Sequence, residues 1–140
     1  MSWEADNLPG RSQSPISRTL MLEECWALLG TSGVGRIAVI VAGVPRIVPV
    51  NYSVAGDVIY FRTAPGTILN NVTLQKVAFE ADAVDPASRS GWSVCVVGSG
   101  FSSGDGGPAV DSWAPGTREL RYRIVPEEVS GRRLYGSATR

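Results

Sequence analysis

The chain has 140 residues, of which 44% are hydrophobic and 19% charged, and this composition is typical of one soluble globular domain. Thirteen basic residues balance thirteen acidic ones, so no net charge attracts nucleic acid or an anionic membrane. The chain contains no histidine. This absence excludes a Ser-His-Asp triad, histidine-bound zinc and a histidine-ligated haem.

The first residues differ in character from the rest of the chain. Residues 1–17 are polar and contain Pro9 and Pro15, which predicts a flexible N-terminal arm. Residues 18–140 are then predicted to form a single domain. No stretch resembles a signal peptide or a membrane span, so we expect a cytoplasmic protein without a membrane or nucleic-acid partner. Cys25 and Cys95 lie far apart without metal-ligand spacing, which indicates buried free thiols and no metal site.

The apolar patterns predict one short helix followed by a succession of strands. The stretch TLMLEECWALLG, from Thr19 to Gly30, has apolar residues near helical spacing and a plausible cap at each end. Residues 35–42, 45–54 and 58–63 form apolar runs joined by short glycine turns, which is typical of an antiparallel meander. Residues 75–85, 91–101 and 118–125 continue the strand pattern after a helical segment at about 65–73. A closing segment after residue 125 is either a last strand or a turn. About six antiparallel strands with two short helices indicate a small barrel or sandwich.

Pro49 interrupts the predicted strand 45–54. Proline lacks the N–H that a central strand donates, so it indicates a strand edge, a bulge or a place where the sheet opens. Because side chains alternate along a strand, Pro49 shares one face with Ile47, Asn51 and Ser53. The backbone there faces either a ligand or water, and the pattern alone leaves both possibilities open.

The segment FRTAPGTIL, residues 61–69, joins a strand to a helical pattern. Pro65 suits the first position of a helix, where free N–H groups and the helix dipole favour an anion. The guanidinium of Arg62 and the hydroxyls of Thr63 and Thr67 would add donors for a phosphate group. The alternative is a plain turn with a capping threonine.

The order of these segments resembles a known family. The set VGR, PVNY, FRTAPGT, VAFEAD, GWSV and WAPG, in this order from about Leu22 to Leu134, is similar to the pyridoxamine 5′-phosphate oxidase-like family of FMN-binding split barrels, in particular its short actinobacterial members. The resemblance implies a mainly β, six-stranded antiparallel split β-barrel with two or more short helices. It also implies a homodimer with FMN at the subunit interface.

The same resemblance implies a set of cofactor-binding residues. The strand Arg46, Val48, Pro49, Val50 and Asn51 would run along the flavin ring, and Arg62, Thr63 and Thr67 would receive the phosphate. Trp92 and Ser93 match a stretch near the cofactor, and Trp92 and Trp113 would either cover an aromatic ring or pack as ordinary core residues. Ile68 stands where relatives commonly carry a lysine or arginine.

Three functions remain open on these grounds. The first is a homodimeric flavin-dependent oxidoreductase with an unknown substrate and an unassigned catalytic residue. The second is a non-catalytic flavin or deazaflavin binding protein. The third is a split barrel that has lost its cofactor. Bound flavin would itself supply hydride or electron transfer, so the lack of histidine does not argue against the first.

Overall fold

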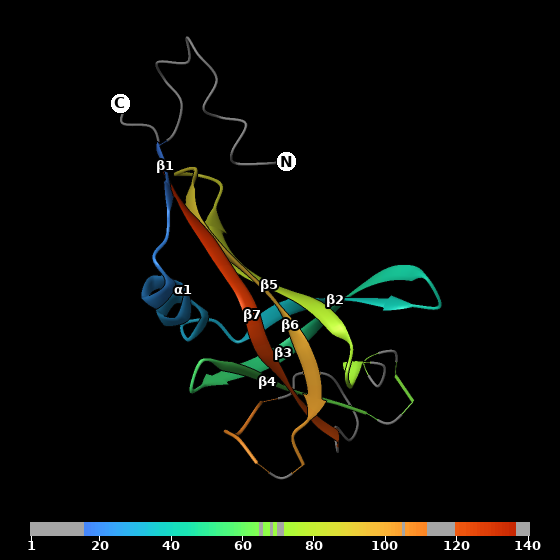
Figure 1. Cartoon of the computed structure of the whole chain (residues 1–140). Helices are drawn as coiled ribbons and strands as arrows, with labels where there is room; N and C mark the ends of the chain where they lie inside the picture. The colour runs from blue at the N-terminus through green and yellow to red at the C-terminus, as the bar shows by residue number, and fades with distance from the viewer. Residues whose placement is uncertain are drawn as a thin grey trace.

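A computed structural model describes residues 16–64, 66–67, 69, 72–104, 106–111 and 120–136, and these residues form a mainly β fold (Figure 1). In chain order the elements are β1 (Ile16–Thr19), α1 (Leu22–Leu29), β2 (Val34–Val41), β3 (Val44–Ala55), β4 (Val58–Thr63), β5 (Lys76–Asp85), β6 (Ser90–Ser102) and β7 (Leu120–Tyr135). Every strand pair within this sheet is antiparallel.

The expected count of six strands and at least two helices is wrong for the described residues, which hold seven strands and one α-helix. The additional strand is β1, whose first two residues, Ile16 and Ser17, belong to the segment predicted as a flexible arm. Among the described residues of the helical segment expected at about 65–73, Leu69 and Val72 are 3₁₀-helical, Gly66 lies in a turn and Thr73 forms a β-bridge with Gly100. The predicted strand 118–125 and the closing segment are one strand, β7.

The strand order β1-β7-β4-β3-β2-β5-β6, with a further pairing between β6 and β7, turns the sheet back on itself. The long strand β7 makes this closure possible because it pairs with β4 through residues 120–124 and with β6 through residues 122–134. Its last residues also pair with β1. A ring of strands leaves fewer exposed sheet edges than an open sheet would.

Alternation along the strands divides the side chains into an inner and an outer set. The inner set forms one core cluster, and its fully buried members include Ile37, Ile59, Phe61, Phe79 and Ile124. The ring of Tyr52 meets that of Phe79 edge to face at 4.8 Å between centroids, and the Tyr52 hydroxyl donates to the carbonyl of Leu29 at 2.6 Å. This bond satisfies a buried hydroxyl and fixes the end of α1 to β3.

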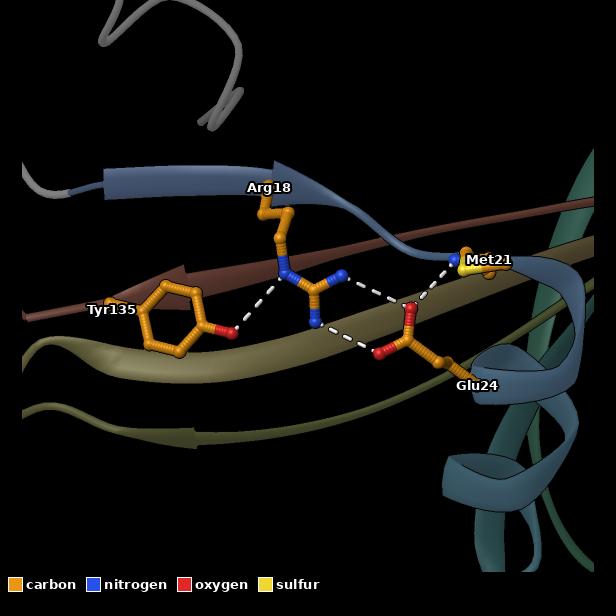
Figure 2. Close-up of polar contacts among 4 residues, drawn as sticks. All are labelled: Arg18, Met21, Glu24 and Tyr135. Atoms are coloured by element: carbon orange, nitrogen blue, oxygen red, sulfur yellow. Dashed lines mark hydrogen bonds and ion pairs between the residues drawn. The ribbon is translucent and has the colours of Figure 1, made fainter.

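An exposed ionic group connects β1, α1 and β7 (Figure 2). The guanidinium of Arg18 donates to both carboxylate oxygens of Glu24, at 3.1 and 2.9 Å, and to the hydroxyl of Tyr135 at 3.3 Å. Glu24 also accepts from the N–H of Met21 at 2.9 Å, which caps the helix. The bond from Arg18 lowers the pKa of Glu24 to about 2, so this carboxylate is ionised at neutral pH.

A bulge interrupts the pairing of β6 with β7. Val97 pairs with Glu128 but Gly98 pairs with Pro126, so Glu127 is an extra residue on β7. Pro126 has no N–H to donate, which explains why the ladder breaks there. The strands lie so close at this point that a Cβ added to Gly98 would stand 2.2 Å from the carbonyl oxygen of Val125.

This contact predicts that Gly98→Ala destabilises the protein by about 1–3 kcal/mol, since the obstructing atom belongs to the backbone and cannot rotate away. Gly33→Ala is the matched control, because nothing lies within 4 Å of a Cβ at that position. Urea denaturation of both variants and the wild type measures the difference. Equal stabilities of the two variants would contradict the prediction.

Candidate functional site

The sheet opens along the first part of β3. Residues Val44 to Asn51 pair with β2, whereas β4 pairs with β3 only from Tyr52 to Ala55. In the described residues, the second edge of β3 over positions 44–50 therefore has no strand beside it, and the β2–β3 hairpin extends away from the other strands (Figure 1). Pro49 lies within this open stretch. A place where the sheet opens was one of the three settings, beside a strand edge and a bulge, that the proline indicated.

The predicted ring-binding strand presents two different faces. Pro49 and Asn51 point to the outer face of the sheet, and the Asn51 side-chain amide donates to the carbonyl of Gly33 at 3.3 Å. Val48 and Val50 point to the core, so they can reach an outer ligand only through their main chain. Arg46 is exposed further along the hairpin, opposite Val39.

Trp92 and Ser93 lie on opposite sides of β6. Trp92 is 6% exposed and belongs to the core cluster, which is the packing role that the sequence left open. Ser93 is half-buried on the outer face, opposite Asp82 of β5. Trp113, the second candidate for covering a ring, lies outside the described residues.

The residues predicted to bind the phosphate also lie on opposite sides of their strand. Thr63 is 3% exposed and its hydroxyl lies 2.6 Å from that of Thr67, so the two threonines are brought together at the end of β4. Arg62 points to the opposite side of β4, because successive strand residues alternate. The structure thus places the three residues at one strand end but on two sides of it. Pro65 and Ile68 lie outside the described residues.

A glycine-rich segment covers the outer face beside Arg62. We call residues 102–110, of which 105 is not described, the strap. The hydroxyl of Ser53 donates to the carbonyl of Ala109 at 2.7 Å, and Nη1 of Arg62 donates to that of Val110 at 3.4 Å. Gly107 (φ +91°) lies against Tyr60, where an added Cβ would stand 2.5 Å from the ring. The absence of a side chain therefore lets the strap lie directly on β4.

The outer face of β2 and β5 carries an apolar hollow of about 270 Å³. Two small residues of its lining, Ala38 and Ala78, stand opposite each other, and Ile47, 73% exposed, borders it on the β3 side. Arg36, Phe79, Glu80 and Cys95 complete the lining. Cys95 is exposed, so the expectation that both cysteines are buried is wrong for Cys95 and correct for Cys25.

A charged group lies at the edge of this hollow. Nη1 of Arg36 contacts Glu80 at 2.8 Å and Asp82 at 3.6 Å, so one cation serves two carboxylates. Burial raises the pKa of Glu80 to about 7, and the hydrogen bond and charge of Asp82 add to the effect, while Arg36 opposes it. Glu80 therefore gains or loses a proton near neutral pH, which is an unusual property for a carboxyl group on a sheet face.

Arg36, Glu80 and Asp82 were not among the residues singled out from the sequence. Arg36 lies on β2, 44 positions before Glu80 on β5. Only the pairing of these two strands brings the three side chains together. The available signal was the alternation of VAFEADAVD, which places Glu80 and Asp82 on one face. In the described part of the chain no cluster of three or more His, Cys, Asp or Glu side chains could hold a metal ion, and no helix there is long and apolar enough to cross a membrane.

A family model and a curated relative each match more than half of the chain. The family model of pyridoxamine 5′-phosphate oxidase matches residues 22–102. An uncharacterised protein of Mycobacterium tuberculosis is 31% identical over 144 residues, covering 90% of this chain and 94% of its own.

Several solved structures are also similar. An FAD-binding protein of Mycobacterium smegmatis is 31% identical with a TM-score of 0.68, over 84% of this chain and 98% of its own. A predicted pyridoxamine 5′-phosphate oxidase of Corynebacterium glutamicum has 29% identity and a TM-score of 0.75, over 88% and 96% of the two chains. An FAD-binding protein of Mesorhizobium loti has 26% identity and a TM-score of 0.68, over 86% and 98%.

The charged group generates a prediction about pH. The folded pKa of Glu80, about 7, lies above the ordinary value of 4.5, so the folded state keeps a proton that the unfolded state releases. The contribution of Glu80 to stability is thus largest below about pH 4.5 and is lost as the pH rises to about 7. Glu80→Gln keeps the hydrogen-bonding shape without the charge. We expect this variant to gain stability relative to the wild type between pH 5 and pH 8.

Denaturation of both proteins with urea across this pH range measures that difference. The wild type and the variant have all other titrating groups in common, so the effects of those groups cancel in the comparison. Carboxyl NMR provides the direct titration curve of Glu80, and Asp82→Asn should move its midpoint downward by removing the neighbouring charge. A Glu80 midpoint near 4.5 in the wild type would disprove the assignment.

Proposed function

Because the chain belongs to the pyridoxamine 5′-phosphate oxidase family, we propose that it is a flavin-binding oxidoreductase of that family, with FMN as its cofactor. The observation that carries the proposal is the open stretch of β3 at positions 44–50. A strand with one free edge offers main-chain donors and acceptors to the polar rim of a flat heterocycle. Pro49 and Asn51 place their side chains on the outer face there.

The residues around this stretch fit a phosphorylated flavin. Arg62 follows on the same outer face and supplies a guanidinium, whose planar fork matches phosphate oxygens. The apolar hollow bordered by Ile47 offers a surface for an aromatic ring system. Ser93 and Asn51 add polar groups suited to orienting a ligand.

The similar structures support a flavin as the ligand class. Two of them, from Mycobacterium smegmatis and Mesorhizobium loti, are FAD-binding proteins whose chains this one matches over almost their whole length. FMN is the smaller flavin and requires a single phosphate site, which Arg62 provides. Bound flavin would supply the hydride or electron transfer, and Glu80 would hold or release a proton beside the hollow near neutral pH.

We further propose that two copies associate through the outer face of β2, β3 and β5. Ile40 and Ile47 are large apolar side chains exposed on this face, and together with the hollow they form an apolar surface of the kind that marks an interface. The second copy would cover the hollow at Ala38 and Ala78 and so enclose a ring bound there. The cofactor would then lie between the two chains.

Flavin binding is tested by titrating the dialysed protein with FMN and following tryptophan fluorescence. We expect saturable quenching at micromolar FMN. Arg62→Gln should weaken binding by about 10- to 100-fold, since it removes a charge-assisted bond to the phosphate. Arg89→Gln, which removes an equal charge in the exposed β5–β6 turn, is the matched control.

The outcomes separate the parts of the proposal. No saturable binding of FMN, FAD or a deazaflavin would refute flavin binding. Equal affinity of the two arginine variants would remove Arg62 from the site. Bound flavin that neither a nicotinamide donor nor an oxidant can cycle would refute the oxidoreductase activity and favour a non-catalytic flavin-binding protein.

The dimer is tested by a charge on the proposed interface. Ile47→Glu should convert the dimer to a monomer in size-exclusion chromatography with light scattering, because an ionised carboxylate would be buried between two apolar faces. Leu74→Glu is the control, since Leu74 is 77% exposed and lies outside this face. A wild-type protein that is monomeric, or an Ile47 variant that stays dimeric, would contradict the prediction.

A further inference from the structure

The outer face of β2 and β5 carries more negative than positive charge beside its apolar hollow. Among the described residues, Arg36 is the cation in ion-pair contact with Glu80 and with Asp82, at 2.8 and 3.6 Å. One guanidinium faces two carboxylates, so one negative charge has no counterion when both carboxylates are ionised. The hollow next to this group is lined mainly by apolar side chains, which cannot offset that charge.

The neighbouring cations of the sheet are directed elsewhere. Lys76, four residues before Glu80 on β5, contacts Glu127 at 2.6 Å. Arg132 of β7 donates to the hydroxyls of Ser17 and Thr19, at 2.8 and 3.1 Å, and so extends toward β1. Within the described part of the chain, neither cation makes an ion pair with the two carboxylates beside the hollow.

The other groups around Glu80 are neutral near pH 7. Cys95 of β6 stands directly opposite Glu80, and burial together with the charges of the two carboxylates raises the pKa of its thiol. Ser130, which follows Cys95 across β7, carries no charge. Tyr52 of β3 lies on the core side, where burial raises the pKa of its hydroxyl. The negative charge beside the hollow is therefore compensated only by Arg36 among these neighbours.

A symmetric interface over this face would bring the unbalanced charge of two copies together. In a two-fold dimer the same surface belongs to both chains, so the excess carboxylate occurs twice. Closing the interface removes water from these charges, and a charge without a counterion is unfavourable there. A carboxyl group avoids this cost by binding a proton. Glu80 is suited to do so, because burial has already raised its pKa to about 7 in the single chain.

We propose that the association of two copies through this face is coupled to the protonation of Glu80. Each copy takes one proton from the solvent as the interface closes, and Arg36 then balances Asp82 alone. The inference rests on the dimer of the proposed function and does not require the flavin. Because the dimer holds the proton more tightly than the single chain, association is strongest at low pH and weakens as the pH rises through about 7.

The composition of the chain makes this coupling measurable. The chain contains no histidine, which is the side chain that ordinarily titrates between pH 6 and pH 8. In the part of the chain that the structure describes, Glu80 is the carboxyl group with a pKa near 7, whereas the pKa values of Glu24 and Glu127 are lowered. A change in association over this range therefore reports on Glu80.

The first experiment measures the dimer dissociation constant of the purified protein by analytical ultracentrifugation at pH 6 and pH 8, at constant salt. We expect it to be about 10- to 100-fold larger at pH 8, because both copies must regain a proton that they have lost. Glu80→Gln is neutral and similar in shape, so it should dimerise at both pH values as tightly as the wild type does at pH 6. Glu23→Gln is the matched control on exposed α1 and should keep the wild-type pH dependence.

A second variant and a second measurement support the same test. Asp82→Asn leaves Arg36 with one carboxylate, so it should tighten the dimer at pH 8 and flatten the pH dependence even if Glu80→Gln fails to fold. Dilution calorimetry in two buffers of different ionisation enthalpy counts the protons bound on association. We expect about one proton per copy at pH 8 in the wild type, and none in Asp82→Asn.

The outcomes distinguish this inference from the dimer on which it rests. A dimer that is equally tight at pH 6 and pH 8 would overturn the coupling and leave the dimer intact. A pH dependence that persists in Glu80→Gln and Asp82→Asn would assign the proton to another group and would also overturn the proposal. A protein that is monomeric at both pH values would refute the dimer and the coupling together, while FMN titration of the same samples judges flavin binding separately.

Discussion

The closure of the sheet through β7 is the constraint on which the rest of the structure depends. This strand pairs with β4 and β6 near its start and with β1 and β6 near its end, so it holds together segments from both ends of the chain. Closure fixes which side of every strand faces the core, because a shift of one residue would turn each buried side chain outward. The bulge at Glu127 lets one continuous strand follow this path past Pro126. Closure of the sheet therefore decides both which side chains form the core and which lie on the outer face.

Alternation on this closed sheet then separates charges on the outer face. Over β2 and β5 one arginine, Arg36, faces two carboxylates, and the pKa of Glu80 rises in consequence of burial and of Asp82. Over β4 and β7, Arg121 and Arg123 donate to main-chain carbonyls, and among the described residues neither has a carboxylate in ion-pair contact. A chain without net charge thus carries a proton-sensitive acidic region and a basic region on one sheet. Composition alone excludes a global field but says nothing about such local separation.

The strands were the part of the fold that sequence patterns predicted best. The segment 58–63 was predicted with its exact bounds, and the other strands differ by one or two residues, apart from the last. Beyond residue 125 the sequence left a strand and a turn open, because Pro126 and Gly131 are typical of chain breaks. The structure continues β7 through both positions. β1 was missed since four residues with a single apolar member, Ile16, carry no strand signal, and its pairing with β7 is a tertiary contact.

The sequence by itself determined the antiparallel β class, the alternation of each strand and the family, because all three depend on local order along the chain. It also identified Pro49 as a place where a strand has no full set of neighbours. Only the tertiary structure decided which residues share a surface. It places Arg62 and Thr63 on opposite sides of β4, puts Trp92 in the core, and joins Arg36 to Glu80. It also sets Arg121 across from Arg62. The physical reason is that pairing between strands far apart in sequence is set by sheet closure, which no local pattern encodes.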